Sequence, residues 1–409
     1  MEQQKPTSRF IQFLRNPYFL LAILIFMIFG PITVIYLLHG DFFGYYALAD
    51  TFFTTGTTTH PHFIYIILLN AVRSLIPFNV FSFLSPTFGS YLFNHAYPLA
   101  AFLIVIAAYL FLGYVLYNHL KKAKIQGAPW STLVLMLVAP INLFTLSKHD
   151  LYLGYIGITV FHNPPMALLK PVALLLFWGL TTGLTSNELK LKDYVGIFVL
   201  SALSVSIKPS FAICLLPASA LYIIFLALKR SKPNLKFYLI SFVLPTVLIL
   251  LYQYFYHFGD VGFQSRIAFD PLRAMLLYTP SALLLGFMFL MSIAFPLLTL
   301  ILAFKDVKKE GNLIFAWTTF IVAAIYTYLL TETGALSGDL NFEWSAEITL
   351  FVLFVETTVF VFKQYPLVFT KFRLMLKKLA LYLLLTLHFL GGIAWYLGEL
   401  FQRKMWWGW

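Results

Sequence analysis

The segment AYPLAAFLIVIAAYLFLGYVLY, residues 96–117, decides the class of fold. It contains no charged residue, and Lys121, Lys122 and Lys124 follow shortly after it. A helix needs about 20 mostly apolar residues to cross the hydrocarbon core of a bilayer. Lysines collect in the loops on the cytoplasmic side. The segment therefore predicts a transmembrane helix whose C-terminal end faces the cytoplasm.

The composition of the whole chain agrees with this interpretation. Of 409 residues, 60% are hydrophobic and 11% are charged, and the mean hydropathy is +0.84. A soluble domain is usually about 45–50% apolar and about 25% charged, so a water-soluble enzyme is excluded. The net charge of +12 would suggest a nucleic-acid partner in a soluble protein. Here we assign the excess to membrane sidedness, with no nucleic acid as partner. The single Cys214 excludes a disulfide framework and a cysteine-based metal site.

Runs similar to residues 96–117 recur along the chain. We expect an all-α, polytopic integral membrane protein with about 11 transmembrane helices, forming a single domain over residues 1–409. The candidate spans are residues 17–38, 96–117, 129–147, 165–184, 193–207, 209–228, 237–256, 279–303, 312–331, 345–362 and 379–397.

A further apolar run, residues 62–78, decides the topology. If it crosses the membrane, every later loop changes side and Lys121 faces outward. If it lies flat, most of the 28 Lys and Arg residues fall in inner loops, as the positive-inside rule requires. More than half of the 16 acidic residues then fall on the outer side. We therefore predict that residues 39–95 form a first extracytoplasmic loop with membrane-parallel amphipathic helices. The expected location is the bacterial inner (cytoplasmic) membrane, with the active site facing outward.

Two acidic residues of that loop are the candidate catalytic groups. Asp41 lies just past the first span, at the expected membrane surface, and Asp50 follows it. A carboxylate placed there can act as a general base. Asp41 can also bind a divalent cation such as Mg²⁺ or Mn²⁺ as a cofactor. The alternative for Asp41 is the N-cap of a surface helix. For His60 and His62, turn and cap roles are favoured over metal binding.

A second polar cluster lies between the third and fourth spans, on the expected outer side. It includes His162 and Asn163, directly before Pro164. Lysine and protonated histidine can bind phosphate, while an aspartate orients the histidine. A solvated loop and an Asn163 helix cap are the alternatives. The candidate substrate-binding residues here are Lys148, His149, Asp150, His162 and Asn163.

Two Lys-Pro steps place ammonium groups near the outer ends of spans. Lys170 lies inside the fourth span and Lys208 directly precedes the sixth. An ionisable group within a span is a functional candidate by default, and snorkelling to the interface is the alternative. Either lysine can bind the phosphate of a polyprenyl carrier.

The last two outer loops complete the candidate set. Arg266 and Arg273 have the forked geometry that suits phosphate, although Arg–Asp pairs that fix the loop explain them equally well. Carboxylates, an amide and an indole in one loop suit sugar recognition, with helix caps as the alternative. These residues are Glu332, Asn341, Glu343 and Trp344.

This layout resembles the GT-C superfamily of polytopic membrane glycosyltransferases, which use polyprenyl-phosphate-linked sugars on the outer face. The resemblance covers most of the chain as topology. The family's early catalytic acid would fall on Asp41, and a paired-acid pattern would extend to Asp50, although eight residues separate the two. Lys208-Pro209-Ser210-Phe211 is similar to the Lys-Pro step of members that use polyprenyl-phosphate mannose.

The resemblance implies transfer of a sugar from a polyprenyl-phosphate lipid carrier to a lipid or glycan acceptor, among membrane lipids. It implies that Asp41 deprotonates the acceptor and that a lysine or arginine stabilises the departing phosphate. Three alternatives stay open. A polysaccharide polymerase or ligase acting on undecaprenyl-diphosphate-linked repeats would depend on Arg266 and Arg273. A transporter or flippase would need ionisable residues deep in the membrane, of which Glu356 is the clearest. A non-catalytic membrane scaffold is the third.

Overall fold

The structure is a computed structural model, and it describes residues 16–37, 40–57, 60–77, 82–83, 85, 87, 95–141, 154–158, 161–186, 188–258, 266–279, 281–334, 337–338, 340–368 and 371–402. Within these ranges nine helices are long and apolar enough to cross a membrane. The expected class, an all-α polytopic membrane protein, is thereby confirmed. The nine are α2 (Pro17–Tyr36), α7 (Ala96–Lys122), α9 (Pro164–Thr185), α11 (Ser210–Leu228), a composite helix (Leu235–Tyr256), α15 (Ala282–Leu302), α17 (Gly311–Leu329), α18 (Glu343–Gln364) and α19 (Phe372–Phe401 of a helix that ends at Gln402).

The composite helix has three parts, and the elements outside the nine are shorter. The composite helix consists of α12 (Leu235–Phe237), a π-helical segment η1 (Tyr238–Val243) and α13 (Leu244–Phe258). Helix α10 (Leu191–Ile207) has 17 residues and α4 (Phe63–Ser74) has 12, too few for α4 to cross a bilayer alone. The others are α3 (Gly40–Thr55), α8 (Ala128–Leu137), α14 (Arg273–Leu276), α16 (Phe304–Val307), β1 (Ile267–Phe269) and β2 (Leu330–Glu332).

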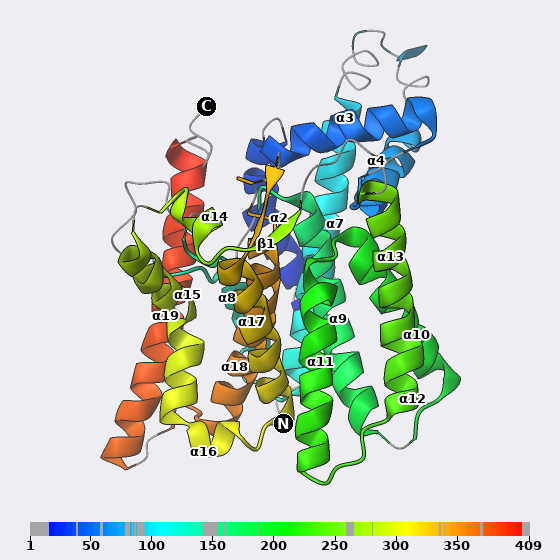
Figure 1. Cartoon of the computed structure of the whole chain (residues 1–409). Coiled ribbons are helices and arrows are strands. Elements are labelled where there is room, and N and C mark those ends of the chain that lie inside the picture. Colours follow the sequence, from blue (N-terminus) through cyan, green and yellow to red (C-terminus); the bar gives the residue numbers. More distant parts are fainter. Residues whose placement is uncertain are drawn as a thin grey trace, which may run out of the picture.

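The two ends of the bundle differ in what they carry. Helix α3 lies crosswise at one end, together with α4, β1 and α14, whereas α12 and α16 lie at the opposite end (Figure 1). We call the first the site end. The opposite end carries lysines on its short elements, including Lys236 of α12 and Lys305 of α16. These lysines, which the sequence predicts for inner loops, therefore lie at the end of the bundle opposite the site end.

Residues 129–147 do not form the predicted continuous helix. Helix α8 ends at Leu137, and Ala139 N–H donates to the carbonyl of His388 in α19. A Cβ on Gly392 would lie 1.5 Å from the Leu137 carbonyl oxygen, so only glycine allows this close approach. The apolar sequence predicts burial correctly, but backbone groups of neighbouring helices replace the helical hydrogen bonds.

His388 holds this interruption in place. Its Nδ1 lies 2.7 Å from the Ala139 carbonyl oxygen, and its Nε2 accepts from Phe295 N–H at 3.3 Å. A carbonyl cannot donate and an amide cannot accept, so the imidazole is neutral with its proton on Nδ1. Ile141 N–H donates to the carbonyl of Met291, which α15 would otherwise use for Phe295. The His388 side chain thus provides hydrogen-bond partners for the Ala139 carbonyl and the Phe295 N–H, which lack their usual helical partners here.

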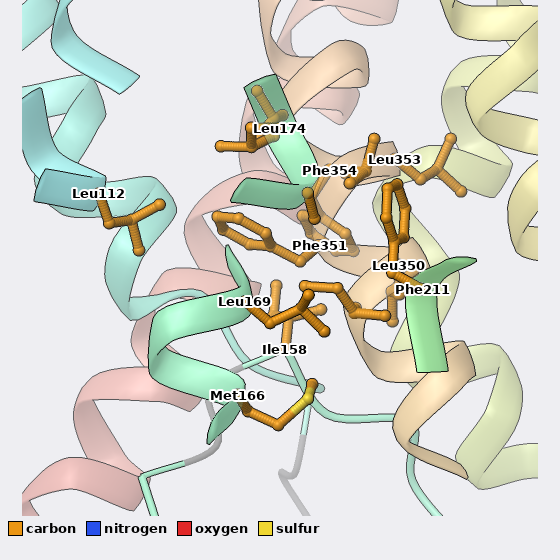
Figure 2. Close-up of a cluster of buried hydrophobic side chains, with 14 of the residues drawn as sticks. Leu112, Ile158, Met166, Leu169, Leu174, Phe211, Leu350, Phe351, Leu353 and Phe354 are labelled. Carbon is orange, nitrogen blue, oxygen red and sulfur yellow. The ribbon is translucent and has the colours of Figure 1, made fainter. Parts of the chain in front are cut away.

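Helix α18 forms the centre of the hydrophobic core and is almost wholly buried. It packs against α17, α11, α15 and α9. Figure 2 shows its side chains interleaved with those of the neighbouring helices. The labelled members are Leu350, Phe351, Leu353 and Phe354 of α18, Met166, Leu169 and Leu174 of α9, Phe211 of α11, Leu112 of α7, and Ile158. The N-terminal turn of α18 is thereby fixed at the site end.

A short antiparallel ribbon joins two polar loops at the site end. Strands β1 and β2 pair with Ala268 opposite Thr331. Arg266 N–H donates to Thr333 Oγ1, and Thr333 N–H donates to the Arg266 carbonyl. The loops that the sequence separates by more than 60 residues therefore lie side by side.

Candidate functional site

A polar cavity of about 400 Å³ opens at the site end. Its walls come from α3, the turn before α4, the residues before α9, the α10–α11 junction and the loop before α18. Such a volume lies within the roughly 300–1,000 Å³ of small-molecule sites. Among the residues that line it are Asp41, Tyr45, His60, His62, His162, Asn163, Lys208, Asn341 and Trp344. Six of the sequence-predicted site residues therefore meet in one cavity.

Asn163 connects the acid and the lysine of this cavity. Its amide Nδ2 donates to Asp41 Oδ2 at 2.7 Å, and its Oδ1 accepts from Lys208 Nζ at 3.4 Å. Oδ1 also accepts from Met166 N–H, so Asn163 caps helix α9, which is the alternative role that the sequence left open. The hydrogen bond from Met166 N–H fixes the Asn163 amide, and this amide orients the Asp41 carboxylate. No described residue donates a hydrogen bond to Asp41 Oδ1, which is the oxygen that can accept from a ligand hydroxyl.

Lys208 lies at the junction where α10 ends and α11 begins. Its Nζ lies 4.0 Å from the centre of the Trp344 ring, over the indole face, and the side chain is 3% exposed. Burial lowers the pKa of Lys208 to about 8, although Asp41 and Glu347 oppose the change. A face of Trp344 is therefore occupied by a cation, rather than by a sugar ring as the sequence suggested.

His162 forms the back wall of the cavity. Its ring packs against Trp344 and Tyr36, with ring centres 5.4 Å and 6.5 Å away. Burial lowers the pKa of His162 to about 4, with Asp41 opposing the change and Lys208 adding to it. The imidazole is therefore neutral at pH 7, and His162 does not supply the positive charge that the sequence suggested for phosphate binding.

Tyr45 places the two histidines of the first loop. It lies one turn after Asp41 on the same face of α3. Its hydroxyl bonds His62 Nδ1, and its ring meets the His60 ring edge-on at 5.4 Å. Burial, and then the charge of Asp41, raise the pKa of Tyr45, so the hydroxyl is the donor. The sequence pointed to turn roles for both histidines and did not place them in the site.

The structure does not bring Asp50 to Asp41. Both lie on α3, but nine residues correspond to about two and a half turns, which places them on opposite faces. Asp50 is exposed, lies 3.9 Å from Arg73 and accepts from the Tyr97 hydroxyl at 3.4 Å. It does not line the cavity. Asp41 is the carboxylate that lines it among the residues described.

The other predicted lysine lies inside the bundle. Lys170 is buried in α9, with its Nζ 5.6 Å from the Phe351 ring centre. Its charge, like that of Lys208, interacts with Glu347 of α18. Glu347 is buried, and it is not among the site residues that the sequence predicts. The signal that could have identified Glu347 is a carboxylate two residues inside the predicted span 345–362. Lys148, His149 and Asp150 lie outside the residues that the structure describes.

The remaining candidates stand apart from the cavity or at its rim. Arg266 and Arg273 are exposed, and Arg273 pairs with Asp270 at 3.1 Å. Asn341, at the rim, donates to Glu332 at 2.6 Å. Glu343 is buried at the start of α18, and its carboxylate has no hydrogen-bond partner among the described residues. It does not line the cavity.

The described part of the cavity does not fit a metal ion. Nowhere in the described ranges do three His, Cys, Asp or Glu side chains gather closely enough to hold one. Mg²⁺ and Mn²⁺ prefer several oxygen ligands, and Asp41 offers one carboxylate next to an amide and an ammonium group. We derive no chemical step through a metal.

An apolar groove is the second hollow that bears on function. It has a volume of about 540 Å³ and is lined by α4, α7 and α9, for example by Leu68, Ala107 and Val172. Ile207 lines the groove and the next residue, Lys208, lines the cavity. The α10–α11 junction therefore contributes one residue to the groove and the next residue, a buried cation, to the cavity. Comparisons of the chain with protein-family models, curated proteins and solved structures found no match.

Proposed function

We propose that the protein is a membrane glycosyltransferase that moves a sugar from a polyprenyl-phosphate-linked donor to a lipid or glycan acceptor. The observation that carries the proposal is the Asp41–Asn163–Lys208 network, together with an apolar groove whose lining includes Ile207, the residue before Lys208. A donor of this class has an anionic phosphate between a sugar and a long apolar chain. The cavity offers a cation to the phosphate, and the groove offers an apolar surface to the chain.

The residues support one order of events. Asp41 Oδ1 accepts the proton of the acceptor hydroxyl, and the hydroxyl oxygen forms a bond to the anomeric carbon. The bond from that carbon to the phosphate oxygen breaks, and the phosphate keeps the electron pair. Lys208 stabilises the negative charge that develops on the leaving phosphate. Attack opposite the leaving group inverts the anomeric configuration.

The groove has the features that a polyprenyl tail requires. Its lining residues are apolar, and it is not enclosed. The tail already lies in the hydrocarbon of the bilayer, so its entry into an apolar groove exposes no hydrocarbon to water, and the groove serves to position the donor. Lys208 then sets which atom of the donor lies beside Asp41.

The proposal is tested by reconstituting the chain in liposomes with polyprenyl-phosphate-linked hexoses and pentoses and an extract of membrane lipids and glycans. Release of polyprenyl phosphate and formation of product are measured by mass spectrometry. Asp41→Asn is expected to lower the rate by about 10²–10⁴-fold because it removes the general base. Asp50→Asn, on the opposite face of α3, is expected to retain the wild-type rate. Transfer that survives Asp41→Asn at full rate, or no release from any donor, would contradict the proposal.

A transporter or flippase is the second candidate, and a specific observation favours it. Buried ionisable groups lie inside helices: Lys170 in α9, and Glu347 and Glu356 in α18. Glu356 accepts from Trp178 Nε1 at 2.6 Å and lies 3.9 Å from His119 Nε2. Helix α8 also ends at Leu137, within an apolar run, and transporters often have helices that stop inside the membrane. Movement of a fluorescent polyprenyl phosphate across liposomes, without sugar transfer, would support this candidate over the first.

A further inference from the structure

A second, smaller cavity lies next to the polar one. It has a volume of about 240 Å³ and lies between the His60–Pro61 turn and the site end of α13. His60 lines both cavities, so the two adjoin at this side chain. The volume is below the roughly 300 Å³ at which sites for drug-sized ligands begin. It suits one ring.

The walls of this second cavity have the chemistry of a sugar site. Tyr252 and Tyr256 of α13 stack with ring centres 5.4 Å apart and planes 13° apart. Between them in sequence, the buried Gln253 donates from Nε2 to the carbonyls of Pro61 and Val205, at 3.0 and 3.2 Å. These bonds fix the amide and leave its carbonyl oxygen as an acceptor. Aromatic faces pack on the C–H surface of a pyranose, and fixed amides bind its hydroxyls.

One face of helix α3 runs over both cavities in order. Asp41, Tyr45 and Leu48 line the polar cavity, and Phe52 and Gly56 line the second. At 1.5 Å per residue, Phe52 lies about 16 Å along the helix from Asp41. A single sugar ring cannot contact both residues. A ligand that uses both cavities therefore has more than one ring.

We propose that the second cavity binds the second sugar ring of an oligosaccharide acceptor whose terminal ring reacts beside Asp41. This inference rests on the proposed transferase function and narrows the acceptor to a glycan of at least two rings. His60, which lines both cavities, lies between the terminal sugar ring beside Asp41 and the second sugar ring.

The test measures binding, so it does not depend on turnover. Methyl monoglycosides and methyl diglycosides of mannose, glucose and galactose are titrated against the full chain in nanodiscs by saturation-transfer NMR. For at least one sugar we expect the diglycoside to bind about tenfold more tightly than the monoglycoside, the size of one good aromatic stacking contact. Tyr252→Ala combined with Tyr256→Ala is expected to abolish that difference.

Tyr254→Ala is the matched control, because Tyr254 belongs to the same helix and is exposed, but does not line the cavity. It is expected to keep the tenfold difference. Equal binding of mono- and diglycosides by the wild type, or equal losses in the Tyr254 and Tyr252/Tyr256 variants, would overturn the inference. Failure of the transferase proposal has another signature: diglycosides bind with the predicted pattern, but no donor releases its sugar.

Discussion

At the scale of single residues, the position of Lys208 determines how activity should depend on pH. Burial lowers the pKa of its ammonium group to about 8. Below that pH the group is charged and can bind the donor phosphate, and above it the charge is lost. We therefore expect kcat/KM to fall about tenfold for each pH unit above 8. The fall in kcat should come at higher pH, because bound phosphate stabilises the ammonium group.

Lys208→Arg identifies the group responsible for that pH dependence. Arginine stays charged up to about pH 12, so the variant should lose the decrease above pH 8, even where its overall rate is lower. Initial rates measured between pH 6 and pH 10 for both proteins decide this. A decrease that persists unchanged in Lys208→Arg would assign it to another group.

Asn163 carries two roles that substitutions can separate. Serine caps helices about as well as asparagine, but it is too short to join Asp41 to Lys208. Asn163→Ser should therefore keep the melting temperature, while kcat/KM falls about 10–100-fold through loss of charge-assisted hydrogen bonds. Asn163→Ala should lose the same activity and about 1 kcal/mol of stability as well. Equal activity in Asn163→Ser and wild type would show that the amide does not position Asp41.

Local sequence patterns identify several residues of the cavity, but they do not show which of these residues contact one another. Asp41, His162, Asn163 and Lys208 were all singled out, each for its own local pattern. Their meeting depends on the packing of α3, α9 and α10, which no local pattern encodes. The neutral state of His162 likewise follows from burial, so its predicted charge could not be judged from the chain alone.

At the scale of elements, the close contact between Gly392 of α19 and the end of α8 leads to a specific prediction about stability. Gly392→Ala would place a methyl group against the Leu137 carbonyl, a backbone group that cannot rotate away. We expect a loss of about 1–3 kcal/mol, as for overpacked cores, measured as a lower melting temperature in detergent. Gly398→Ala, on the same helix and facing open space, should leave the melting temperature unchanged or raise it. Equal melting temperatures for the two variants would contradict the close approach.

Helices were predictable where hydropathy alone determines them. Most of the candidate spans coincide with helices of the structure, because long apolar runs in a bilayer must satisfy their own backbone. The run at 129–147 differs because α15 and α19 supply hydrogen-bond partners from outside the segment. The nine-residue spacing of Asp41 and Asp50 could have separated the two acids, but only once a helix was assumed for residues 40–55.

At the scale of the whole molecule, the charge asymmetry predicts orientation. We propose that the site end faces outward and the α16 end faces the cytoplasm. Cysteines introduced as Arg266→Cys and Lys308→Cys probe the two ends, both at exposed positions, in a chain whose native Cys214 is buried. A membrane-impermeant maleimide should label Arg266→Cys in intact cells, and Lys308→Cys only after permeabilisation. The reverse pattern would invert the topology.

The most direct test of the central claim is a structure of the chain bound to a non-transferable phosphonate analogue of a polyprenyl-phosphate sugar. We expect the phosphonate about 3 Å from Lys208 Nζ, the sugar beside Asp41, and the tail along the groove lined by α4, α7 and α9. A phosphonate bound instead at Arg266 and Arg273, or a tail outside that groove, would contradict it.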